Sequence, residues 1–362
     1  MKNQHGLIDK ISHKYSLDEK LMTGNAFLAL LFIIHLLVGY VAMWQFELLD
    51  YFTLSLYSEM LYTSLVSIVI LKFVIYYIDY RKRHINDAEQ TSLKSEIFKS
   101  CFNRNTFLSL LIPLLFFPSF FALFSATKSM IHVFNPFYLD EMFMKIDRFL
   151  HFGIDPWKIT HTVFSGAWGS LFLSFIYAIW FGMMLYYTLW MMVSIKMRKH
   201  RFQYLTSFIL CWFLLGSVLA VFLSSAGPVY FGRVTGDISV YEPLMDILRS
   251  HNEPYKDQFL YVYALDVQDY LWNSYLKTTI DVGTGISAMP IMHLSIAALL
   301  YFSAKELNKN FGYAMLIFLI LIQIGSVHLG WHYAIDGYVS IFLTWLIWKL
   351  MGYLCDKIYH EE

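Results

Sequence analysis

Long blocks of apolar residues dominate the chain and predict its architecture. A run of roughly 18 to 25 mostly apolar residues can cross the hydrocarbon layer of a membrane, about 30 Å, as a helix. Such runs occur eight times, at 25–46, 57–78, 106–125, 168–194, 204–225, 288–304, 311–329 and 332–354. The last two form one apolar block, in which Gly330 is the expected point of reversal. The pattern predicts an all-α fold, a polytopic membrane helix bundle with about eight transmembrane helices.

Two stretches between these runs follow a helical stripe instead of a continuous block. They are residues 140–153 and 265–276, and their spacing predicts amphipathic interfacial helices on the outer face of the bundle. The first stripe consists of Met142, Phe143, Ile146, Phe149 and Leu150. Such helices either cover the bundle or form a platform for a lipid headgroup, and the pattern is compatible with both.

The composition agrees with a membrane protein and excludes one class of partner. Hydrophobic residues make up 57% of the chain and charged residues only 15%. Lysine plus arginine equal aspartate plus glutamate at 27 each, so no basic field points to nucleic acid. The polar first 24 residues lead into an apolar run without a small-residue cleavage site, so we expect a retained first span.

Positive residues are unevenly distributed between the two sides of the predicted bundle. Eighteen lie on the side of the termini, mainly in the N-terminal tail, the 79–105 loop and the 195–203 turn, and eight lie on the other side. Because positive residues concentrate in cytoplasmic loops, we expect a multi-pass cell-membrane protein with both termini cytoplasmic. The outer segments are then 126–167, 226–287 and 329–331.

The three cysteines suggest neither disulfides nor a metal site. Cys101, Cys211 and Cys355 match no ligand spacing, and one falls in the middle of a predicted span. We therefore expect no metal and no cofactor.

The stretch HLGWHYAIDG, residues 328–337, places ionisable groups inside an apolar block. His332 and Asp336 are four residues apart and therefore share one helix face. A carboxylate that accepts a hydrogen bond from one ring nitrogen leaves the other unprotonated, as a nucleophile requires. The alternative is a polar pair that packs two helices together. Because an ionisable group at membrane depth costs about 3 kcal/mol, we favour a functional role.

A second candidate element is GTGISAMPIMHLS, residues 283–295, on the same outer side. Pro290 suits the first position of a helix, where its missing N–H costs nothing. The next three backbone N–H groups would then form an anion site: Ile291, Met292 and His293. The alternative is a glycine loop with an incidental histidine. A phosphate held there between His293 and His332 would be placed for phosphoryl transfer.

These two motifs, in this order, resemble those of the type 2 phosphatidic acid phosphatase superfamily. Pro290-Ile291-Met292-His293 is similar to its Pro-Ser-Gly-His motif, and Gly330, His332 and Asp336 are similar to its third motif. HisTyrAlaIleAsp is also similar to the corresponding stretch of inositol phosphorylceramide and sphingomyelin synthases, an inositolphosphotransferase-like branch. The six-helix catalytic core would cover 106–362, with 1–105 as an N-terminal addition.

The resemblance implies roles for these residues, and three departures qualify them. It implies a phosphohistidine on His332, general acid and base catalysis by His293, and support of His332 by Asp336. Ser326 stands where hydrolytic members have a phosphate-binding arginine, Ile291 replaces the motif serine, and the first motif is missing. Arg233, in AGPVYFGR, is the nearest candidate cation; the alternative is an interfacial anchor.

His328 completes the set of candidate residues. It is either another phosphate donor or half of a metal pair with His332, although a turn at Gly330 would break the helical spacing of that pair. Ile291, Met292 and Ser326 are the remaining phosphate-binding candidates.

Four functions are compatible with these residues. The first is transfer of a phosphate or phosphorylated headgroup from a lipid phosphate or phospholipid to a lipid or alcohol acceptor at the outer leaflet. The second is a lipid phosphate phosphatase, with water as acceptor. The others are an intramembrane zinc hydrolase that uses His293, His328 and His332, and a transporter or scaffold that binds an anion. For the enzyme we expect activity near neutral pH that fails in acid as His332 is protonated.

Overall fold

The structure is a computed structural model, and it describes residues 2–51, 53–83, 104–194 and 197–359. All regular secondary structure in these residues is helical, which confirms the predicted all-α class. The long helices are α1 (Lys2–Gln45), α2 (Ser58–Arg83), α4 (Arg104–Ser129), α8 (Gly166–Val193), α9 (Arg198–Leu210), α14 (Met292–Leu307), α15 (Lys309–His328) and α16 (Ala334–Tyr359). Cys101 lies outside the described residues, and Cys211 and Cys355 are buried and free.

Five segments of the described chain are long and apolar enough to cross a membrane. They are Gly24–Gln45, Gly166–Met192, Arg198–Phe222, Lys309–His328 and Ala334–Ile358. The other three predicted spans coincide with α2, α4 and α14, which are not among these five. At 1.5 Å per residue, the 16 residues of α14 extend about 24 Å, short of a full crossing. The protein is thus a multi-pass membrane protein, and within the described residues five of the eight expected spans are candidate membrane spans.

The third of these five segments starts earlier than predicted and changes its helical form. It consists of α9, a π-helical stretch at Cys211–Leu219 and α10 (Ala220–Phe222). The predicted polar turn at 195–203 is partly helical because Arg201 is buried, and its Nε donates to the Met192 carbonyl at 2.9 Å.

The short helix α14 lies at the centre of the bundle. It packs against α8, α9, α15 and α16, and ten of its residues are buried. Its position explains its length, since a helix enclosed by other helices does not need to match the thickness of the membrane. Its first turn carries His293, so the central helix presents a candidate catalytic residue at its end.

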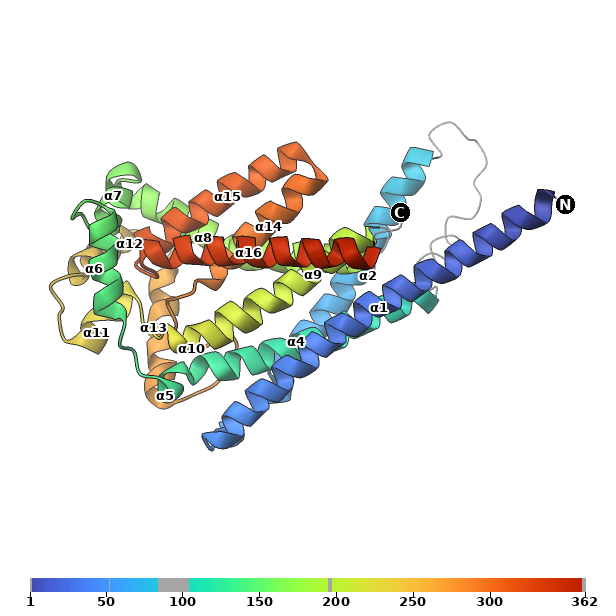
Figure 1. Cartoon of the computed structure of the whole chain (residues 1–362). Helices are drawn as coiled ribbons and strands as arrows, with labels where there is room; N and C mark the ends of the chain where they lie inside the picture. Colours follow the sequence, from blue (N-terminus) through green and yellow to red (C-terminus); the bar gives the residue numbers. More distant parts are fainter. Residues whose placement is uncertain (1, 52, 84–103, 195–196, 360–362) are drawn as a thin grey trace.

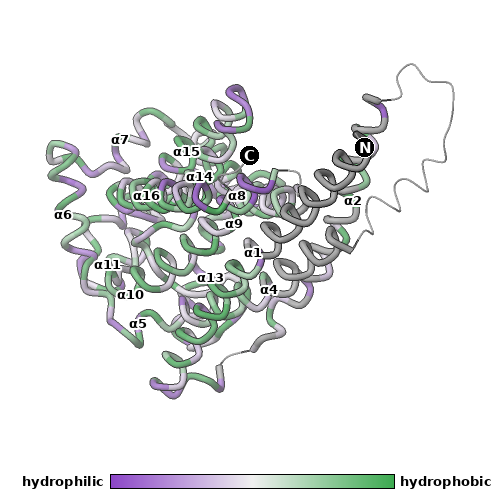
Figure 2. The backbone as a smooth tube through the Cα atoms, turned by 45° about the vertical axis from the view of Figure 1, so that its right-hand side comes forward, coloured by the Kyte–Doolittle hydropathy of each residue, from purple (hydrophilic) through white to green (hydrophobic). Residues whose placement is uncertain are grey.

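Short helices cover one end of the bundle. They are α5 (Ile131–Phe134), α6 (Asp140–Leu150), α7 (Pro156–Val163), α11 (Phe231–Thr235), α12 (Glu242–Asn252) and α13 (Ala264–Lys277). Figure 1 shows them at the end opposite to both chain termini. Figure 2 shows hydrophilic segments at α6 and α7, whereas α14 and α16 are mostly hydrophobic. The two interfacial helices predicted from the sequence correspond to α6 and α13.

Helix α6 differs from the prediction in the face that it buries. Phe143 and Met144 point inward together with two carboxylates, Asp140 and Asp147, each 2% exposed. Phe149, in contrast, is 82% exposed. The apolar stripe therefore does not describe the inward face, which follows the i, i+3, i+4, i+7 spacing from Asp140.

Candidate active site

The turn between α15 and α16 positions His332. Helix α15 ends at His328, Gly330 has φ +74°, and α16 begins at Ala334, which confirms the predicted reversal at Gly330. The backbone N–H of His332 donates to the Ser326 carbonyl at 3.2 Å. His332 is 7% exposed, and its Nδ1 donates to the Ala288 carbonyl at 2.8 Å. In the neutral ring this bond places the free electron pair on Nε2.

Asp336 does not hydrogen-bond to the imidazole of His332. Its Oδ2 lies 3.8 Å from Nδ1 and accepts instead from the backbone N–H of Tyr333 at 3.0 Å. Tyr333 immediately precedes α16 and Asp336 is its third residue, so this is one half of a capping box. The i, i+4 spacing predicted from sequence fails because His332 lies in the turn, before the helix begins.

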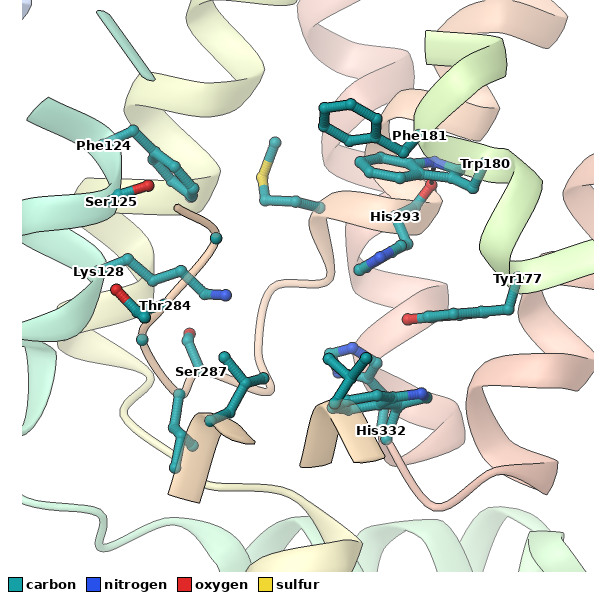
Figure 3. Close-up of a pocket in the computed structure, with 18 of the residues that line it drawn as sticks. Phe124, Ser125, Lys128, Tyr177, Trp180, Phe181, Thr284, Ser287, His293 and His332 are labelled. Carbon is teal, nitrogen blue, oxygen red and sulfur yellow. Dashed lines mark hydrogen bonds between the residues drawn. The ribbon is translucent and has the colours of Figure 1, made fainter. Parts of the chain in front are cut away.

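His293 lies across from His332 in the same cavity. The two ring centroids are 6.4 Å apart, and Figure 3 shows both rings facing the open space. The ring of His293 stacks on Tyr177 at 4.4 Å and contacts Trp180 at 4.2 Å, and Trp180 Nε1 donates to the His293 carbonyl at 2.8 Å. Aromatic side chains of α8 therefore orient the first turn of α14.

The start of α14 differs from the sequence prediction. The helix begins at Met292, and Pro290 lies before it, after a cis peptide bond. The N–H of Ile291 donates to Ser340 Oγ at 2.7 Å, so it is not free to bind an anion. The N–H groups of Met292 and His293 lie in the first helical turn, where no intrahelical acceptor exists. The predicted anion site is therefore reduced to two of its three amides.

A cavity of about 320 Å³ joins the two histidines to side chains from other helices. Residues of α4, α8, α13, the 283–290 loop and the turn before α16 line it, and most of them are aromatic or aliphatic. Lys128 of α4 is a lining residue that the sequence analysis did not single out (Figure 3). Among the described residues, four lining side chains have buried polar atoms without a partner: Tyr177, Trp212, Ser287 and Trp331. A buried polar atom without a hydrogen-bond partner is energetically costly. Several such atoms in one cavity are therefore typical of a binding site for a polar ligand.

Two carboxylates of α6 support the turn from outside the cavity. Asp147 accepts from the N–H groups of Ala334 and Ile335 at 2.7 and 2.8 Å. Asp140 accepts from Tyr333 Oη at 2.8 Å and from the amides of the neighbouring 226–227 loop. Burial raises the pKa of both carboxyls, while these amide hydrogen bonds act in the opposite direction. Sequence reasoning missed both residues because two acids on an outer helix predict a solvated face.

The family follows from a comparison with protein-family models. Residues 141–350 match the PAP2 superfamily, and this segment is more than half of the chain. The chain belongs to the PAP2 superfamily. PAP2 enzymes are metal-independent phosphatases and phosphotransferases. Comparison with curated proteins and with solved structures gives no match.

One wall of the cavity precedes the segment that matches PAP2. Tyr57 comes from a short helix, Leu54–Tyr57, and its hydroxyl bonds to Ser125 at 2.7 Å and accepts from the N–H of Gly283 at 3.1 Å. Lys128 follows one turn after Ser125 on α4. The cavity therefore uses residues from both sides of the predicted boundary at 105.

Four of the predicted phosphate-binding residues do not line this cavity: Arg233, Ile291, Ser326 and His328. The guanidinium of Arg233 lies 4.9 Å from the ring of Trp272 and 3.6 Å from a carboxylate oxygen of Asp269, as an interfacial anchor would. Ser326 donates to the Gln323 carbonyl at 2.8 Å. His328 faces away from the cavity because its ring packs into a separate histidine cluster.

That cluster replaces the metal pair considered for His328. Its ring stacks on His161 with centroids 3.6 Å apart, and Ser170 Oγ lies 2.9 Å from His328 Nε2 and from His251 Nδ1. Within the described part of the chain, no group of three His, Cys, Asp or Glu side chains is arranged to hold a metal ion. His293, His328 and His332, the trio of the zinc-hydrolase alternative, are thus not brought together.

Proposed function

We propose that this PAP2 protein is an integral-membrane lipid phosphotransferase that uses a phosphohistidine on His332. The arrangement of His293 and His332 carries the proposal, because their rings lie 6.4 Å apart on one cavity. That separation lets the two rings contact opposite sides of one phosphoryl group. The stretch HYAID supports a place near the inositol phosphorylceramide and sphingomyelin synthase branch.

The chemistry has two steps. In the first, Nε2 of His332 attacks phosphorus, the bond from phosphorus to the leaving oxygen breaks, and His293 gives that oxygen a proton. In the second, His293 takes a proton from the acceptor hydroxyl, the acceptor oxygen attacks phosphorus, and the bond to Nε2 breaks. The backbone N–H groups of Met292 and His293 and the unpaired donors of Tyr177 and Ser287 are positioned to stabilise the equatorial oxygens.

The wall of the cavity favours an alcohol acceptor over water. Its side chains are mostly aromatic or aliphatic, so few groups can hold an attacking water in place. Ser326 in place of the arginine of hydrolytic members points in the same direction. A lipid or alcohol hydroxyl is therefore the proposed acceptor, with water as the alternative.

We propose that the cavity opens at the outer leaflet. Residues of α13 line it, and α13 is one of the short helices at the end of the bundle opposite to both termini (Figure 1). The excess of lysine and arginine on the terminal side favours a cytoplasmic location for the termini.

Trapping the phosphoenzyme tests this proposal. Purified protein is mixed with phosphorus-labelled phosphatidic acid or phosphatidylinositol, quenched in alkali because phosphohistidine is acid-labile, and analysed by peptide mass spectrometry. We expect the label on His332 and its loss in His332→Ala. His132→Ala, a histidine that does not line the cavity, is the control. Label on another residue, or turnover by His332→Ala at the wild-type rate, contradicts the proposal.

Adding an acceptor separates the two reactions. With ceramide or diacylglycerol present, a transferase moves the labelled group to the acceptor lipid. Release of free phosphate alone leaves only the phosphatase alternative.

A further inference from the structure

The corner between α6 and α7 carries large apolar side chains that the fold leaves exposed. Phe149 is 82% exposed, Phe152 96% and Ile154 48%. Side chains with this exposure contribute little to the core of the protein. An exposed apolar cluster is typical of a surface that contacts a membrane or another protein. The corner, residues 149–154, is therefore a candidate surface for an apolar partner.

Hydrogen bonds within the corner give it a defined shape. The N–H of Gly153 donates to the Arg148 carbonyl at 2.7 Å, and the N–H of Ile154 donates to the His151 carbonyl at 3.1 Å. Phe152 has φ +57°, a left-handed conformation that bulky residues rarely adopt. The exposure of the Phe152 ring thus follows from a structured turn that ends α6.

His151 joins the corner to the first turns of α16. Its Nδ1 donates to the Asp147 carbonyl at 2.7 Å, so in the neutral ring Nε2 accepts from Tyr338 Oη at 3.0 Å. Tyr338 belongs to the candidate membrane span Ala334–Ile358 and begins an exposed apolar stripe on it. The stripe consists of Tyr338, Phe342, Trp345, Leu346 and Leu350, each at least 40% exposed. Figure 1 shows α6 and α7 beside the start of α16, so the corner continues the lipid-facing side of this span.

The polar residues next to the corner give it a net positive charge. Asp155 pairs with both Arg148 and Lys158, so two cations share one carboxylate. The side chains of Arg148 and Lys158 are 38% and 55% exposed, whereas that of Asp155 is 4% exposed. Apolar side chains beside exposed cations fit the boundary between the acyl chains and the phosphates of a bilayer. Both the continuity with α16 and the charge therefore favour lipid as the partner.

We propose that the corner inserts Phe149 and Phe152 into the lipid leaflet on the side opposite to both termini. Arg148 and Lys158 then lie at the level of the lipid phosphates. This inference goes beyond the proposed function and does not depend on it, because insertion requires no chemistry in the cavity.

The same helix holds the turn that carries His332. Asp147, at the end of α6, accepts from the N–H groups of Ala334 and Ile335 at the start of α16. An anchor at the corner therefore fixes the depth of this turn relative to the lipid surface. The corner sets where a lipid phosphate meets the protein, although it contacts no residue of the cavity wall directly.

Spin labelling in vesicles of phosphatidylcholine and phosphatidylglycerol tests the inference. In a Cys101→Ser background, a nitroxide is attached to Phe152→Cys or to a control, Ile238→Cys; Cys211 and Cys355 are buried. Ile238 is also apolar and 65% exposed, but it lies between Asp237 and Ser239 in the turn after α11. The readout is the ratio of collision rates with oxygen, which concentrates in lipid, and with a nickel chelate, which stays in water. We expect a ratio about five-fold higher at position 152 than at position 238.

A second pair of variants examines the other aromatic ring of the corner. Phe149→Ser should lower the ratio at position 152, and Phe149→Leu should preserve it, because leucine keeps the apolar surface. An unchanged ratio in Phe149→Ser would overturn the part of Phe149 in the anchor. Equal ratios at positions 152 and 238 overturn the whole inference. Low access to both reagents with dipolar broadening between labels would show a second copy of the chain on the corner, which also overturns it.

Discussion

Nδ1 of His332 donates a hydrogen bond to the carbonyl oxygen of Ala288, at 2.8 Å. A carbonyl can only accept, so this contact fixes the proton of the neutral ring on Nδ1 and leaves Nε2 unprotonated. The partner that orients the ring thus belongs to the loop before α14, and this loop links the two candidate catalytic histidines.

This contact predicts the site of phosphorylation on the ring. We expect phosphorus on Nε2 of His332, because Nδ1 is held by its hydrogen bond to the Ala288 carbonyl. Correlation of phosphorus with ring nitrogens by NMR on the alkali-quenched protein distinguishes the two isomers. Phosphorus on Nδ1 would show that the imidazole ring of His332 leaves its hydrogen bond to Ala288 and rotates before it attacks phosphorus.

Asp336 should contribute less to catalysis than its sequence position suggests. Its nearest oxygen is 3.8 Å from His332 Nδ1, and it caps α16 through the N–H of Tyr333. We expect Asp336→Asn to lower kcat by no more than about ten-fold. A carboxylate that holds a catalytic histidine costs about 10⁴-fold when it is replaced by an amide. Steady-state kinetics of Asp336→Asn decide between these two losses of kcat. A loss near 10⁴-fold would show that Asp336 orients the ring of His332.

Asp147 should act by positioning the turn that carries His332. Loss of its hydrogen bonds to Ala334 and Ile335 leaves one buried and one half-buried amide unpaired, so Asp147→Ala should destabilise the protein by about 2 kcal/mol. We expect kcat to fall more than KM rises, with partial recovery in Asp147→Asn. Thermal unfolding and steady-state kinetics measure both effects. Glu141→Gln, at an exposed position on the same helix, is the control. Equal kcat and equal unfolding temperature in Asp147→Ala and Glu141→Gln would contradict this role.

The pKa of His332 predicts the behaviour of the protein in acid. Its ring lies in the turn outside α15 and α16, and burial lowers its pKa to about 3, with the charge of Lys128 acting in the same direction and the hydrogen bond to Ala288 against it. An imidazole with a lowered pKa stays neutral until the pH falls to that value. His332 protonation therefore does not limit attack between about pH 5 and pH 7, unlike a ring with the ordinary pKa of about 6.5.

Single-turnover kinetics test this point. The substrate is a nitrophenyl phosphodiester, which does not ionise in this range and whose leaving group needs no added proton. We expect its rate of phosphohistidine formation to change by less than about two-fold from about pH 7 to pH 5. A ten-fold fall per pH unit below about 6.5 would instead agree with the expectation from sequence.

The sequence predicted that His293 and His332 belong to one site, because each of them lies in a short local motif. His293 follows a proline at the start of a helix, and His332 follows a glycine turn, so neither required knowledge of distant contacts. Asp336 was recognised but given the wrong partner, since a spacing of four implies contact only within a continuous helix. The helix in fact begins two residues after His332.

The remaining site residues depend on contacts between distant segments. Lys128 is one of eight positive residues on the predicted outer side, and its place in the cavity wall depends on packing between the end of α4 and Gly285. Its position just after a span and on the side of both motifs was the available signal. The sequence analysis selected Arg233 instead, but the ring of Trp272 on α13 holds its guanidinium outside the cavity wall.

Phe181 lines the cavity from α8 and is also 50% exposed on the outside of the bundle. The cavity that holds the two histidines therefore shares a wall residue with the exposed surface of α8. A phospholipid at this position could keep its tails among neighbouring lipids while its phosphate reaches the protein. Tail length would then matter little to binding, and selection among substrates would depend on the few groups nearest to phosphorus.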